Sequence, residues 1–177
     1  MSRTSAAGLL VALLVICTLP QANAGMKEVH EAILVGSYAT ALKEIMPLAE
    51  QGVAEALFIL GGIYYKGRGV TQDYQQAIKW YTKAAEQGVT NAQHNLGIMY
   101  FNGEGVPQSN KSAYVWWNIA AFIGNKDAIT NRDIIRNILS PQTLAEAQEL
   151  SAEKYEEIER RKQQQQTDKQ FQLDLQI

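Results

Sequence analysis

Residues 92–106 read AQHNLGIMYFNGEGV, and residues 56–70 read ALFILGGIYYKGRGV. The two stretches lie 36 residues apart and share Ala, Leu-Gly, Tyr and Gly-x-Gly-Val at the same places. Self-similarity at this period is typical of helical repeat arrays, in which each unit buries its apolar face against its neighbours. The period therefore predicts an all-α solenoid of antiparallel helix pairs.

Each repeat is predicted to contain two helices. Helix A ends at the Gly-x-Gly-Val loop and is expected at 54–66 and 90–102, with a degenerate third copy at 126–138. Helix B follows the loop and is expected at 38–50, 74–87 and 110–123. A shorter helix near 27–35 is expected to open the array.

Boundary residues recur at the same period. The predicted N-caps of the B helices can accept hydrogen bonds from first-turn amides, and they are Ser37, Asp73 and Ser109. The glycines that close these helices in a left-handed conformation are Gly52, Gly88 and Gly124. We therefore interpret Asp73 as a cap rather than as a catalytic acid.

Small residues recur where paired helices must approach closely. They are Ala41, Ala77 and Ala113 on helix B and Ala56, Ala92 and Ala128 on helix A. The large side chains expected to fill the space between the helices are Leu60, Tyr64, Trp80, Tyr81, Leu96, Tyr100, Trp116 and Trp117. Neither Gly-x-Gly-Val loop follows a predicted strand or continues into Lys-Ser/Thr, so these loops are interpreted as turns rather than as nucleotide-binding loops.

The repeated positions resemble the pattern of a known family. Residues 92–106 carry Ala-x-x-x-Leu-Gly-x-x-Tyr-x-x-Gly-x-Gly-Val, and residues 73–88 carry Asp-Tyr-x-x-Ala-x-x-Trp-Tyr-x-x-Ala-Ala-Glu-x-Gly. Together they resemble the Sel-one-like repeat (SLR), a relative of the tetratricopeptide repeat, and the resemblance covers about 28–138. It implies a right-handed superhelix that serves as an adaptor for protein partners. Exported bacterial members of the family are often linked to envelope processes or host interaction.

The third copy departs from the pattern. Arg132-Asp133 stands in place of Leu-Gly, and Arg136 stands in place of Tyr. Terminal repeats need a polar outer face for solubility, so this copy is predicted to be a polar capping version of helix A.

The N-terminal residues 1–24 resemble a signal peptide. Arg3 precedes an apolar run over 8–19, and Ala22-Asn23-Ala24 forms a small-residue cleavage site. We expect cleavage near Ala24-Gly25, a periplasmic or secreted protein, and no transmembrane segment afterwards. The net charge of −2 offers no electrostatic footprint for nucleic acid.

The C-terminal residues are expected to form a cap and a tail. The array is assigned to 25–138, and a capping helix over 139–162 is expected to begin at Ser140-Pro141 and cover the last repeat. Residues 163–177 are rich in Gln and are expected to be disordered. An alternative for this tail is a strand, because Phe171, Leu173, Leu175 and Ile177 alternate with polar residues.

The resemblance places helix A on the concave face of the superhelix. The candidate partner-binding residues there are Phe58, Tyr65, Lys66, Asn91, His94, Asn95, Phe101, Asn102 and Asn131. Asn amides can satisfy both the donors and the acceptors of an extended peptide, and the aromatic side chains can act as apolar anchors. The alternative is that Phe58, Ile59, Ile98 and Phe101 only pack between neighbouring A helices.

The predicted function is therefore a non-enzymatic scaffold that binds a protein or peptide, with no cofactor and no metal. Binding of peptidoglycan or another glycan is the main alternative, and a periplasmic hydrolase is a weaker one. The only cysteine, Cys17, lies in the leader, and the only histidines, His30 and His94, are not four residues apart as in a helical zinc site.

Overall fold

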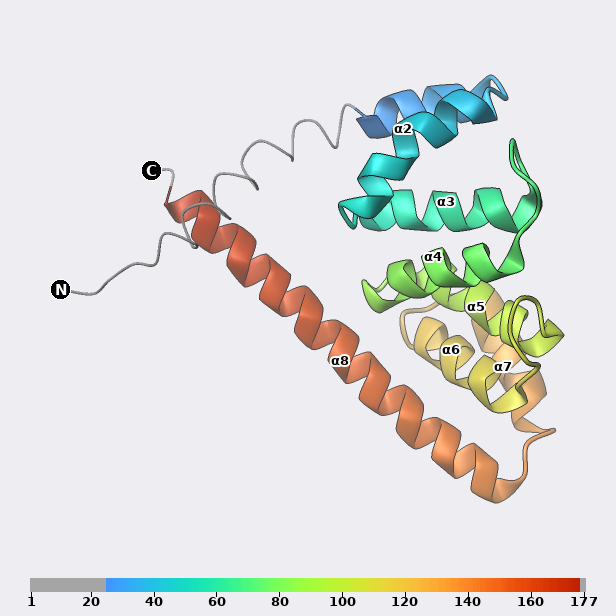
Figure 1. The fold of residues 1–177 in the computed structure, drawn as a ribbon. Helices are drawn as coiled ribbons and strands as arrows, with labels where there is room; N and C mark the ends of the chain where they lie inside the picture. Colours follow the sequence, from blue (N-terminus) through green and yellow to red (C-terminus); the bar gives the residue numbers. More distant parts are fainter. Residues whose placement is uncertain (1–24, 176–177) are drawn as a thin grey trace.

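The computed structural model describes residues 25–175, and its regular elements are all α-helices (Figure 1). Helical backbone covers residues 25–34. The B helices are α2 (Tyr38–Glu50), α4 (Tyr74–Glu86) and α6 (Asn110–Phe122), and the A helices are α3 (Ala54–Lys66), α5 (Thr90–Asn102) and α7 (Lys126–Arg136). Consecutive helices from α2 to α7 pack against one another along the chain, which confirms the all-α solenoid. The last helix is α8 (Pro141–Asp174).

The interface inside each complete repeat depends on a glycine that seats an aromatic ring. A Cβ atom at Gly61 would lie 2.6 Å from Cδ1 of Tyr81, and one at Gly97 would overlap Nε1 and Cδ1 of Trp117. The indole Nε1 of Trp117 also donates a hydrogen bond to the carbonyl of His94, at 3.1 Å. The repeated Leu-Gly pair is therefore a packing motif in which Leu fills the core and Gly admits a ring from the next helix B.

The repeated alanines lie where helices A and B approach each other. All six are fully buried, as predicted, and so are Leu60 and Leu96. Their small volume lets the backbones of paired helices come close at native packing density. Helix approach thus depends on the same residue type in all three copies.

The Gly-x-Gly-Val loops rest on the preceding helix B. Gly105 has a φ of +74°, and a Cβ there would lie 2.5 Å from the carbonyl oxygen of Tyr74. Gly69 has a φ of +73°, and a Cβ there would lie 2.6 Å from Cβ of Tyr38. Both the conformation and the close approach require glycine, which confirms the interpretation of these loops as turns.

Two of the three predicted caps are confirmed. The side chain of Asp73 accepts a hydrogen bond from the amide of Gln76 at 3.0 Å, and Ser109 accepts one from the amide of Ser112 at 3.1 Å. The prediction for Ser37 is wrong, because its side chain makes no cap hydrogen bond and its hydroxyl lies 2.9 Å from that of Thr40. The backbone of Ser37 is not extended like that of the other two, so its side chain is not directed at the first-turn amides.

The last helix, α8, packs against α6 and then passes the C-terminal end of α4 (Figure 1). Asn118 of α6 donates a hydrogen bond to Ser151 at 2.7 Å, and the rings of Phe122 and Tyr155 stack with centroids 5.5 Å apart. Farther along, Arg161 lies 3.6 Å from Glu86 of α4. Ser140 caps the helix as predicted. However, α8 extends back along two repeats instead of covering only the last one.

The predicted end of this helix near Lys162 is wrong, because α8 continues to Asp174. Residues 163–174 are therefore helical. Neither the predicted disorder nor the alternative strand is found there. Side chains four residues apart hydrogen-bond there, from Gln164 to Asp168 and from Gln170 to Asp174, and such pairs support a helix. Gln also has a high helix propensity, which the alternation of apolar residues obscured.

The predicted leader over residues 1–24 lies outside the described residues. Among the helices of residues 25–175, none is both long and apolar enough to cross a membrane.

Candidate functional site

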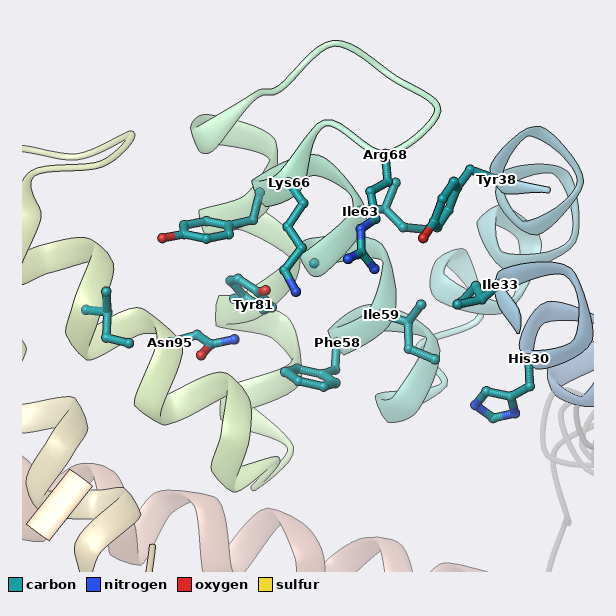
Figure 2. A pocket seen from close by; sticks show the side chains of 13 residues that line it. His30, Ile33, Tyr38, Phe58, Ile59, Ile63, Lys66, Arg68, Tyr81 and Asn95 are labelled. Atoms are coloured by element: carbon teal, nitrogen blue, oxygen red, sulfur yellow. The ribbon is translucent and has the colours of Figure 1, made fainter. Parts of the chain in front are cut away.

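A groove with a volume of about 460 Å³ lies between residues 25–34 and helices α2 to α5 (Figure 2). Its apolar and aromatic lining consists of Ile33, Tyr38, Phe58, Ile59, Gly62, Ile63, Tyr65, Tyr81 and Ile98. Its amide and basic lining consists of His30, Lys66, Arg68 and Asn95. The groove thus combines an apolar floor with positively charged side chains.

One face of α3 supplies the centre of this groove. Phe58, Gly62 and Tyr65 follow one another at helical spacing, beside the stripe that packs against α4. The ring of Phe58 lies 5.8 Å from that of Tyr81, and the ring of Tyr65 lies 6.4 Å from it. Aromatic pairs at such distances stabilise each other, so the floor is built from rings held in place by the repeat itself.

Two basic side chains extend into the groove. Figure 2 shows the ends of Lys66 and Arg68 above the apolar floor. The guanidinium carbon of Arg68 lies 5.5 Å from the ring centroid of Tyr38, at the distance of a cation–π contact. Among residues 25–175, neither Lys66 nor Arg68 forms an ion pair. Nε2 of His30 lies 3.1 Å from a carboxylate oxygen of Glu55.

A contact between the first and second repeats lies beside the groove, at the second Gly-x-Gly-Val loop. The hydroxyl of Tyr65 donates a hydrogen bond to Glu104 at 3.1 Å, and Asn102 donates another at 3.2 Å. Burial, together with the Glu104 carboxylate, raises the pKa of Tyr65 to about 12. The Glu104 carboxylate is thus engaged by neighbouring side chains. Arg68 occupies the same place in the first loop and has no such partner among residues 25–175.

A smaller cavity of about 230 Å³ adjoins the groove through Ile98, which lines both. Phe101, Asn131 and Trp117 also line it. Asn131 lies with its Nδ2 3.2 Å from Nε2 of His94. Burial lowers the pKa of His94, and the charge of Asp127 opposes that shift.

The structure brings most of the predicted partner-binding residues together. Phe58, Tyr65, Lys66 and Asn95 line the groove, whereas Phe101 and Asn131 line the smaller cavity. His94 contacts Asn131, but Asn91 lines neither space, and Asn102 is held by Glu104 instead.

The alternative was that the aromatic side chains only pack between neighbouring helices. Phe58 packs on Tyr81, and Phe101 packs on Trp117 with centroids 5.7 Å apart, while each also lines a cavity. Sequence reasoning missed His30, Tyr38 and Arg68 as lining residues. For Tyr38 a signal existed, because it recurs as Tyr74 one period later.

The polar side chains of this groove are suited to hydrogen bonding. Between residues 25 and 175, no three His, Cys, Asp or Glu side chains lie close enough together to hold a metal ion. Burial raises the pKa of Tyr81, and a hydrogen bond with the side chain of Asn95 opposes that shift. The phenol therefore stays a neutral hydrogen-bonding group at physiological pH.

Comparison with known proteins places this architecture in a family. The Sel1 repeat matches residues 54–89 and 90–121. A structure of c5321, a protective antigen of uropathogenic Escherichia coli strains with an SLR fold, is 31% identical, with a TM-score of 0.74, and the match covers 77% of this chain and 30% of that one. A Sel1 repeat protein from Oxalobacter formigenes is 32% identical, with a TM-score of 0.57, over 63% of this chain and 44% of that one.

The chain thus spans less than half the length of either similar structure. No curated protein matches it. The two matched repeats coincide with α3 to α6, which form the ring-on-glycine interfaces and much of the groove. The chain therefore belongs to the Sel1 repeat family.

Proposed function

We propose that this Sel1 repeat protein is a non-enzymatic scaffold whose groove binds an extended segment of a partner protein. The segment carries an aromatic or large apolar side chain beside an acidic one. The observation that supports this most directly is the position of Lys66 and Arg68 over an apolar floor, with no ion pair of their own among residues 25–175.

The apolar floor favours an anchor side chain. A ring that leaves water against Phe58 and Ile59 gains about 25 cal/mol for each Å² of apolar surface that it buries. Interfaces of this kind concentrate their affinity in a few such anchors. Asn95 at the edge of the groove can hydrogen-bond to the backbone of an extended segment.

The basic side chains favour an acidic neighbour for that anchor. A carboxylate beside Lys66 and Arg68 would complete two ion pairs, and because both side chains are exposed, each pair would contribute about 0.2–1 kcal/mol. Complementary charge also fixes the direction in which the segment lies. An acidic partner therefore fits this groove better than a neutral or basic one.

Selection from a random peptide library displayed on phage tests the proposal. Peptides with an acidic residue next to an aromatic one should be enriched on the wild-type protein. The double variant Lys66→Gln/Arg68→Gln should bind them about tenfold more weakly, equivalent to about 1.4 kcal/mol. The control Lys43→Gln/Lys169→Gln removes two charges from exposed positions outside the groove and should bind as the wild type does.

Two outcomes of this selection contradict the proposal. One is equal binding by the two double variants. The other is enrichment of peptides without acidic residues. A parallel binding assay with soluble peptidoglycan fragments separates the glycan alternative, since binding there that requires Phe58 but not Lys66 or Arg68 would assign the groove to a sugar.

We also propose that the protein is exported. The support is the pattern of residues 1–24, in which a basic start and an apolar run precede Ala22-Asn23-Ala24. Mass spectrometry of the protein from a periplasmic or culture fraction should find an N-terminus at Gly25. Recovery of the uncleaved chain from the cytoplasmic fraction alone would contradict export.

A further inference from the structure

The third repeat places two arginines where the complete repeats are apolar. Arg132 occupies the repeat position that Leu60 and Leu96 occupy in the complete repeats, and Arg136 occupies the position of Tyr64 and Tyr100. In the complete repeats these leucines are fully buried. Arg132 and Arg136 are four residues apart on α7, so their side chains lie on one face of the helix.

This face of α7 is not covered as in the other repeats. The helix that follows, α8, packs mainly against α6 rather than against α7. The residue one period after Trp117 is Glu153, so no ring is available at that position to pack on α7 as Trp117 packs on α5. The substitution of arginine for leucine and tyrosine thus accompanies the loss of the helix A–helix B interface.

A cavity of about 430 Å³ remains between α6, α7 and α8. Its polar lining consists of Tyr114, Asn118, Arg132, Arg136, Gln148 and Ser151. No carboxylate is among the described residues that line it. The cavity therefore combines two guanidinium groups with neutral amide and hydroxyl groups.

Hydrogen bonds fix the polar wall of this cavity. Asn118 is only 8% exposed and donates through Nδ2 to Ser151, at 2.7 Å. Ser151 in turn donates to the carbonyl of Gln148, at 2.8 Å. An amide nitrogen has two N–H groups, so Asn118 retains a second donor in a fixed orientation.

One arginine is also fixed. Nε and Nη2 of Arg132 lie 3.0 Å and 2.9 Å from the same carboxylate oxygen of Asp133. This contact uses two of the five N–H groups of the guanidinium and leaves the others available. Arg136 has no ion pair among residues 25–175, so the site keeps a net positive charge.

We propose that this cavity is a second binding site, independent of the groove, for an oxyanion group: a carboxylate or a phosphate. Arg132 and Arg136 bind the anion, and Asn118 supplies a neutral donor. Planar guanidinium groups match the geometry of such oxyanions and form strong, charge-assisted hydrogen bonds with them. The degenerate repeat thereby gains a ligand site at the position where the array ends.

NMR titration of the full chain with inorganic phosphate and, separately, with succinate tests this proposal. Ionic strength is held constant with chloride. At least one anion should shift the side-chain N–H signals of Arg132, Arg136 and Asn118 along one saturable curve, with a dissociation constant of about 1 mM, equivalent to about 4 kcal/mol. Saturation by phosphate alone assigns a phosphate ligand, and saturation by succinate assigns a carboxylate.

Variants connect the signal to the site. Arg136→Gln should weaken binding about tenfold. Arg136→Lys keeps the charge but loses the planar guanidinium that can form two parallel hydrogen bonds, and it should weaken binding less. Arg160→Gln removes an arginine from an exposed position of α8 and should leave binding unchanged. The proposal is overturned if neither anion gives a saturable shift, or if Arg160→Gln and Arg136→Gln weaken binding equally.

Discussion

The second and third repeats begin alike and end differently. Ala92 and Ala128 are both fully buried at the start of helix A. Beyond them, Leu96 and Gly97 receive Trp117 of the next helix, whereas Arg132 and Asp133 receive no ring. The alanine is thus required wherever helix A packs on the preceding helix B, while the Leu-Gly pair is required only where an aromatic helix B follows.

This difference also separates the two proposed sites. The complete repeats use their rings to build an apolar groove with cations above it, and the terminal repeat uses arginines to line a polar cavity. A change that blocks the ring-on-glycine contact should therefore damage the array more than a change in the terminal unit.

The largest effect is expected from Gly97→Ala. Alanine normally stabilises a helix relative to glycine by about 1 kcal/mol. Here its Cβ would overlap the Trp117 ring, which is held by its hydrogen bond to His94. Overpacking of this kind costs about 1–3 kcal/mol, and urea denaturation should show a loss in that range.

The matched control is Gly62→Ala. Gly62 lies on α3 next to Gly61, and a Cβ there would lie 3.4 Å from the hydroxyl of Tyr81, far less crowded than the Cβ at Gly61. This variant should be as stable as the wild type or slightly more stable. A Gly97→Ala protein as stable as Gly62→Ala would show that the ring-on-glycine interface carries no packing constraint.

A smaller loss is expected from Ser151→Ala, which tests how α8 substitutes for a further repeat. The change removes the protein partner of the buried Asn118 amide, and an unsatisfied buried donor costs about 1–3 kcal/mol, with partial hydration reducing that loss. Thr167→Ala removes an exposed hydroxyl farther along α8 and should change the free energy of unfolding by less than about 0.5 kcal/mol. Equal stability of the two variants would mean that α8 is not anchored at Ser151.

The caps of the B helices give a further test. Asp73→Ala should lower the free energy of unfolding by about 1 kcal/mol because the first-turn amide of Gln76 loses its partner. Ser37→Ala should cost less, since Ser37 accepts no such hydrogen bond. Thermal denaturation of both variants checks the order, and a larger loss for Ser37→Ala would contradict the assigned cap geometry.

The smallest effect concerns His94 between the second and third repeats. Its pKa lies below 6.5 because burial disfavours the imidazolium, so the unfolded chain binds the proton more tightly. The stability contribution of His94 is therefore complete above pH 6.5 and is lost as the pH falls toward the lower pKa of the folded protein. NMR titration of the imidazole should show this depressed pKa, and Asp127→Asn should lower it further. A rise in that variant would contradict the assigned role of Asp127.

Much of the array could be predicted because its constraints repeat along the chain. The period of 36 by itself identifies Ala41, Gly97 and Asp73 as structural residues. The groove was predicted less completely, because His30 precedes the two matched repeats and Arg68 belongs to a loop. The path of α8 follows from contacts such as that between Asn118 and Ser151, which no local sequence pattern encodes.

The central claim is that the groove between residues 25–34 and helices α2 to α5 holds the partner segment. The most direct measurement is an amide NMR titration of the ¹⁵N-labelled protein with the peptide that is most enriched in the library selection. The account predicts shifts concentrated at Phe58, Lys66, Arg68 and Asn95, with the signals of Lys79 and Lys83 on α4 unchanged. Shifts concentrated on α4 and α8 instead would contradict it and assign binding to the opposite face.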